Sequence, residues 1–101
     1  MTITISNTLL QELANHIDKR CVKADYTVNG KTYETALRRS LVDGTTVRKH
    51  IYLTQKHVYG NVTRARLLGE NGEVIATRTD PHVHKATEGL LLEFKFVIEE
   101  G

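Results

Sequence analysis

Hydrophobic positions recur with two different spacings along this chain, and the change falls near residue 21. Before it, apolar residues recur three and four positions apart: Leu9, Leu10, Leu13, Ala14 and Ile17. This spacing predicts an amphipathic helix over about residues 8–20. Ser6, Asn7 and Thr8 are all suitable N-caps, and Thr8 with Gln11 fits a capping box. The apolar stripe is expected to cover a sheet or to dock on another subunit.

From Cys21 onward apolar and polar residues alternate, as they do in strands with one buried face. The first alternating segment ends at Asn29-Gly30. Both residues tolerate positive φ, so the pair predicts a two-residue type I′ hairpin loop. That loop predicts four cross-strand pairs: Val28 with Lys31, Tyr26 with Tyr33, Asp25 with Glu34, and Val22 with Leu37.

A second reversal is predicted at Asp43-Gly44, followed by a strand with an inner and an outer face. Its inner residues are expected to be Val47, Ile51 and Leu53, and its outer residues Arg48, His50, Tyr52 and Thr54. Residues 55–61 are polar and contain Gly60-Asn61, which predicts a loop before the strand over residues 62–68.

In the strand over residues 62–68, Thr63, Ala65 and Leu67 alternate with Arg64 and Arg66. Asn71-Gly72 then predicts a third hairpin, with a loop of either two residues or three residues and a left-handed Gly72. The choice decides whether Val74 or Ile75 faces the core, and the sequence leaves it open.

The last part of the chain combines a polar crossover with a strongly alternating strand. Residues 79–89 are polar, and Pro81 argues against a central strand there. The final strand carries its apolar residues on one side: Leu90, Leu92, Phe94, Phe96 and Ile98. Together these elements predict one mainly β domain over residues 1–101, an antiparallel β-sandwich or flattened barrel of six to seven strands with an N-terminal helix.

Composition adds few constraints on function. The net charge of +2 is too small to imply attraction to nucleic acid or membranes, and no apolar run is long enough to span a bilayer. The single cysteine, Cys21, has no internal disulfide partner and is expected to be a partly buried thiol. Residues 38–85 are rich in Lys and Arg, whereas the charged residues among the last 16 are mainly acidic, an asymmetry that fits solvated strand faces or head-to-tail contact between copies.

Candidate chemistry is sparse. His82 and His84 share one face of an extended segment and could chelate a metal with His50 or His57, but the spacing specifies no third ligand, so no metal or cofactor is expected. Ser6 lies in no nucleophile elbow, nor does the other serine at position 40, and the glycines form no phosphate loop. We therefore do not expect an enzyme.

Basic and aromatic residues in the middle of the chain are the best candidates for contact with a partner. They are Arg48, His50, Tyr52, Arg64 and Arg66. Arginines beside tyrosines are typical of grooves that bind single-stranded nucleic acid, so a module that binds nucleic acid or carbohydrate is the alternative function.

Two segments resemble a known family: "ARLLGENGEVIATR" and, some dozen residues later, "GLLLEFKFVIEE". Together with "YTVNGKTYET", they are similar to small phage tail proteins of Gram-positive hosts, which are encoded near tail-tip and receptor-binding genes. The resemblance covers roughly residues 22–100 and implies a small β-sandwich without catalytic residues. The segment "HVH" departs from the family pattern.

The resemblance implies a non-enzymatic structural or tail-assembly protein that acts through protein–protein interfaces. Its expected partners are other tail or virion proteins, with no membrane and no nucleic acid. Self-association is a further expectation, through the charged regions or through Leu9, Leu13 and Ile17 if the helix does not pack internally. Synthesis is expected in the host cytoplasm, with the virion as the alternative location.

Overall fold

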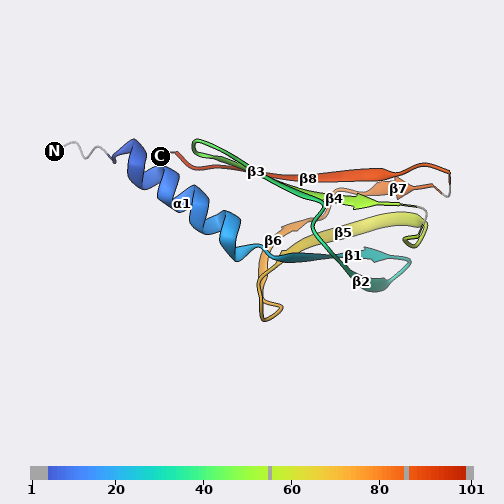
Figure 1. The fold of residues 1–101 in the computed structure, drawn as a ribbon. Coiled ribbons are helices and arrows are strands. Elements are labelled where there is room, and N and C mark those ends of the chain that lie inside the picture. The colour runs from blue at the N-terminus through green and yellow to red at the C-terminus, as the bar shows by residue number, and fades with distance from the viewer. Residues whose placement is uncertain (1–4, 55, 86, 100–101) are drawn as a thin grey trace.

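The computed structural model describes residues 5–54, 56–85 and 87–99, which form one helix and eight strands. Figure 1 shows their arrangement. The elements are α1 (Asn7–Arg20), β1 (Lys23–Val28), β2 (Lys31–Thr35), β3 (Arg39–Asp43), β4 (Thr46–Leu53), β5 (Gly60–Leu68), β6 (Val74–Arg78), β7 (His82–His84) and β8 (Leu90–Val97). The predicted antiparallel sandwich with an N-terminal helix is confirmed. The described residues form eight strands, whereas six to seven were expected.

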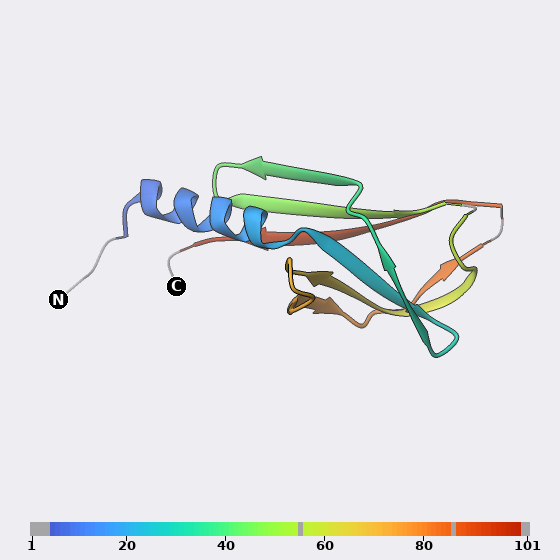
Figure 2. The ribbon, with the colours of Figure 1, turned by 60° about the horizontal axis from the view of Figure 1, so that its bottom comes forward.

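The strands form two antiparallel sheets (Figure 2). Sheet A has the order β2-β1-β5-β6, and the short β7 also pairs with β5. Sheet B has the order β3-β4-β8. Consecutive strands joined by tight turns are neighbours, whereas the β1–β5 and β4–β8 pairs join segments far apart in sequence.

The first hairpin has the predicted turn. Asn29 and Gly30 have φ values of 55° and 79°, as a type I′ loop requires. The predicted pairs of Val28, Tyr26 and Asp25 are all present. The pair of Val22 with Leu37 was wrong, because the β1–β2 ladder ends at the Ala24–Thr35 pair and the amide of Val22 instead donates to the Leu68 carbonyl, 3.0 Å away.

The hairpin between β5 and β6 has the three-residue loop. The Gly69 amide donates to the Glu73 carbonyl at 2.8 Å, and the Gly72 amide donates to the Gly69 carbonyl at 3.0 Å. Gly72 is left-handed, with φ of 82°. Ile75 therefore packs against the core, and Val74 is half exposed.

Two predictions for the second half of the chain were wrong in detail. Gly60 belongs to β5 rather than to the preceding loop, and the polar crossover contains β7, which pairs with the start of β5. Thr63 breaks the alternation of β5 and is exposed, because the β1–β5 register shifts there: Thr27 pairs with Arg64, and the next pair is Val28 with Val62. This bulge turns Val62 inward instead.

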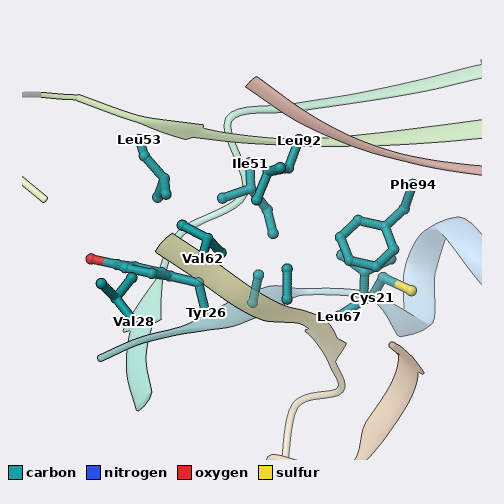
Figure 3. Close-up of a cluster of buried hydrophobic side chains, with 11 residues drawn as sticks. Cys21, Tyr26, Val28, Ile51, Leu53, Val62, Leu67, Leu92 and Phe94 are labelled. Atoms are coloured by element: carbon teal, nitrogen blue, oxygen red, sulfur yellow. The ribbon is translucent and has the colours of Figure 1, made fainter. Parts of the chain in front are cut away.

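The core lies between the two sheets (Figure 3). Sheet A contributes Tyr26, Val28, Val62 and Leu67, and sheet B contributes Ile51, Leu53, Leu92 and Phe94. The predicted inner faces of β4 and β8 are thus confirmed. Cys21 is buried at the edge of this cluster, and burial raises the pKa of its thiol.

The molecule is elongated, with extents of 54 × 26 × 22 Å. Its radius of gyration is 15.5 Å, against about 13 Å for a compact chain of this length. Figures 1 and 2 show the reason: α1 and the β3–β4 end of sheet B project beyond sheet A. We call α1, β3 and the adjoining ends of β4 and β8 the arm, and the region where the sheets overlap the body.

Helix α1 begins one residue earlier than predicted. Its N-cap is Ser6, whose hydroxyl oxygen accepts a hydrogen bond from the Leu9 amide at 3.2 Å. The predicted capping box of Thr8 with Gln11 was therefore wrong. The helix is 14 residues long, and within the described residues no helix has the length and apolar run to cross a bilayer.

Candidate interaction surfaces

The five residues predicted to contact a partner do not form one patch. Arg48, His50 and Tyr52 lie on the outer face of β4 in sheet B. Arg64 and Arg66 lie on the outer face of β5 in sheet A. Because the two sheets pack through their inner faces, the two groups are on opposite sides of the body. A single groove for a nucleic acid strand would need them together.

Arg48 and His50 share one carboxylate. Arg48 Nη1 donates to Glu93 Oε1 at 2.9 Å, and His50 Nε2 lies 2.7 Å from Glu93 Oε2. Glu93 stands on β8, directly across from His50. The hydrogen bond with His50, together with the charge of Arg48, holds the pKa of Glu93 below its usual value. This network lies on the outer face of sheet B.

Arg66 and Asp25 form a second ion pair, on the outer face of sheet A. Arg66 donates two hydrogen bonds to the carboxylate, from Nε at 2.9 Å and from Nη2 at 2.5 Å. The bond with Asp25 raises the pKa of the Arg66 guanidinium. Asp25 is buried because the Arg66 side chain lies over it. Arg64 instead donates to the Thr32 hydroxyl at 3.3 Å.

The tyrosines are separated from one another as well. Tyr26 is buried in the core and stacks on Tyr33, with ring centroids 5.6 Å apart. Tyr52 is 40% exposed, and the Arg38 guanidinium lies over its ring at 5.6 Å. Tyr59 lies beside His84, with ring centroids 5.5 Å apart. Of these rings, Tyr52 lies with Arg48 and His50 on the outer face of β4.

The histidines considered as metal ligands point to different partners. His82 Nε2 lies 2.8 Å from Asp80 Oδ2 in a cluster with Arg78, and hydrogen bonds from Arg78 and His82 lower the pKa of Asp80. His84 is buried, with Nδ1 2.9 Å from the Val58 carbonyl oxygen. His57 binds Thr54. Across residues 5–54, 56–85 and 87–99, no three His, Cys, Asp or Glu side chains are grouped to hold a metal ion.

Lys49 joins α1 to sheet B within the arm, and the sequence pattern did not single it out. Its side chain is only 2% exposed, on the inner face of β4. The ammonium nitrogen donates to three oxygens: Asp18 O at 2.8 Å, Asp18 Oδ1 at 2.7 Å and Ser40 Oγ at 2.8 Å. Since an ammonium group has three hydrogens, all its donors have acceptors. The sequence signal for this buried lysine was its position between the inward-facing Val47 and Ile51.

The apolar side of α1 is wider than the part that packs on sheet B. Ala14 is fully buried, and Ile17 packs against the core. Leu9 and Leu13 are 46% and 45% exposed, and Ile5 is 37% exposed. Residues four apart share one side of a helix, so Leu9 and Leu13 form an exposed apolar stripe on α1, whereas Ile5 lies just before the N-cap Ser6. Val42 and Val97, also on the arm, are 40% and 51% exposed.

Comparison of the chain with protein-family models, with curated proteins and with solved structures found no match.

Proposed function

We propose that the chain is a non-enzymatic structural or tail-assembly protein of a phage, acting through protein–protein interfaces near the receptor-binding tail tip. The observation that supports this proposal is the exposed apolar stripe of Leu9 and Leu13 on a projecting arm. Exposed apolar side chains gathered on one element are typical of surfaces that bind another protein.

The construction of the arm supports the same role. Lys49 fixes the C-terminal half of α1 to sheet B, while the N-terminal half keeps Leu9 and Leu13 exposed. A partner that docks on the stripe would meet a helix whose orientation is already set. Pre-set geometry lowers the entropy lost on binding.

The test is an assembly assay in the genome that encodes the chain. Leu9→Glu with Leu13→Glu places two charges on the stripe and is expected to reduce the number of complete tailed particles seen by electron microscopy. The control, Thr8→Glu with Asn15→Glu, adds the same charges at exposed polar positions of α1 and is expected to leave assembly unchanged. Normal particles after deletion of the gene would contradict the proposal.

A further inference from the structure

The outer edge of β8 has no partner strand. In sheet B the order β3-β4-β8 places β8 at one end, and no strand within residues 5–54, 56–85 and 87–99 pairs with its far side. With eight residues it is the longest edge strand in the two sheets, since β2, β3 and β6 have five each. A long, regular edge strand is a template for pairing with another strand.

One hydrogen bond fixes which residues of β8 face that open edge. The Ile98 amide donates to the Thr45 carbonyl at 2.9 Å, in register with the β4–β8 ladder. Hydrogen-bonded pairs alternate along an antiparallel ladder, so the even-numbered residues of β8 bond to β4. The backbone groups of the odd-numbered residues point outward: Leu91, Glu93, Lys95 and Val97.

We propose that this edge pairs with β8 of a second copy of the chain, antiparallel about a two-fold axis at Phe94. Glu93 then faces Lys95 of the second copy, and Lys95 faces its Glu93. Leu91 faces Val97 of the second copy in the same way. These are all pairs of outward-pointing residues, as the alternation requires. A second copy of the chain would be one partner for the interface-based function proposed above. The pairing rests on that function only in supplying one of its partners.

Charge favours this register over the two that arise when the two-fold axis moves by one residue along β8. A shift that centres the axis on Glu93 sets two glutamates opposite each other, and a shift to Lys95 sets two lysines opposite each other. Like charges directly opposite are unfavourable in a sheet, and opposite charges are favourable. Only the register centred on Phe94 pairs the acid with the base at both positions.

Lys95 is an exposed cation with no acidic partner in its own sheet. Its neighbour across the β4–β8 ladder is Arg48, a like charge. Lys95 makes no hydrogen bond or ion pair with the residues that the structure describes. Glu93 binds Arg48 and His50 through one contact for each carboxylate oxygen, which leaves acceptor positions for a lysine.

The apolar side chains of β8 agree with the same pairing. Leu91 and Val97 are 54% and 51% exposed on the outer face, and the pairing would cover each with the other. One contact already lies at this edge: Arg78 Nη1 donates to the Glu93 carbonyl oxygen at 2.6 Å. A carbonyl oxygen has two acceptor positions, so it can also accept an amide of the second copy.

The first test is the mass of the full chain in solution by light scattering over a range of concentrations. A dimer has twice the 11.4 kDa chain mass. Lys95→Glu places glutamates opposite each other at both ends of the pairing and is expected to raise the dissociation constant on the order of tenfold. Lys31→Glu, which changes an exposed lysine on β2 by the same charge, is the control and is expected to leave the dimer intact.

The second test is disulfide cross-linking, which measures the register. In the proposed pairing, residue 91 of one copy and residue 97 of the other have Cα atoms about 5.5 Å apart, within the range that a disulfide spans. Residue 91 lies roughly 20 Å from its own counterpart. A mixture of Leu91→Cys and Val97→Cys chains should therefore cross-link, and neither variant alone should. Cys21 is buried and leaves the introduced thiols as the exposed ones.

The outcomes separate this inference from the proposed function. A monomer at all concentrations, or cross-linking of either cysteine variant with itself, would overturn the β8 pairing and leave the assembly role to be decided by the particle assay. Unchanged association of Lys95→Glu would also overturn it. A dimer with the mixed cross-link, in a chain whose deletion leaves particles normal, would establish the pairing and contradict the phage role.

Discussion

The body and the arm are held together by different forces. In the body, the two sheets bury mainly apolar side chains, such as Ile51 and Leu92, against each other. In the arm, α1 packs on sheet B alone and is held there by hydrogen bonds from Lys49 to Asp18 and by part of the helix face. Stability should therefore depend mainly on body residues, whereas arm side chains such as Leu9 and Leu13 stay exposed.

Truncation of a core side chain should give the largest effect. Ile51 is fully buried between the sheets, so Ile51→Ala is expected to lower the free energy of unfolding by about 2–5 kcal/mol through lost apolar burial and a residual cavity. Urea unfolding followed by circular dichroism measures the change. A loss no greater than that of an exposed arm residue would break the distinction between the two regions.

Removal of the Lys49 ammonium group should give an intermediate effect, confined to the arm. Lys49→Met keeps the length of the side chain but leaves the oxygens of Asp18 and Ser40 without their donor, at an expected cost of about 1–3 kcal/mol. Hydrogen exchange of the α1 amides should accelerate, while exchange in β1 and β5 should not. Lys56→Met, at an exposed loop position, is the control. Equal acceleration in both regions would show that the arm is not a separate unit.

Acid should weaken the outer face of sheet B by a smaller amount. The pKa of Glu93 is lowered in the folded chain, so its carboxylate stabilises the fold above its unfolded pKa, and this contribution is lost as pH falls through the folded pKa. Glu93→Gln should therefore be less stable than the natural chain at neutral pH, and the two should converge in acid. Unfolding measured at several pH values tests this, and a constant difference would contradict it.

The exposed stripe should contribute least to stability. Leu9→Ser is expected to change the free energy of unfolding by no more than about 0.5 kcal/mol, because the side chain is 46% exposed and packs on no core residue. Thermal unfolding of the natural chain and the variant gives the comparison. A loss as large as that of Ile51→Ala would mean that Leu9 belongs to the folding core and would remove the basis for a docking surface.

Local features of the sequence predicted most of the fold. Asn29-Gly30 and Asn71-Gly72 specify their turns through positive φ, a property of the residues themselves, and the alternation in β8 follows from the two-residue period of a strand. The helix over residues 8–20 was likewise predicted within one residue of its observed start.

The features that sequence analysis missed depend on distant segments. The bulge at Thr63 exists only because β5 must match β1, and β7 is a strand because β5 offers it an edge. The five predicted contact residues share a basic or aromatic character, but their separation onto two faces is decided by which sheet each strand joins. Lys49 broke the apolar pattern of its strand face, yet its acceptors lie on α1 and β3.

The short junction between α1 and β1 has a mechanical consequence. The helix ends at Arg20 and the strand begins at Lys23, so only a very short linker joins them. Strand β1 is bonded on both sides, to β2 and to β5. A pulling force applied to the helix would therefore reach an interior strand directly and load two ladders of hydrogen bonds at once.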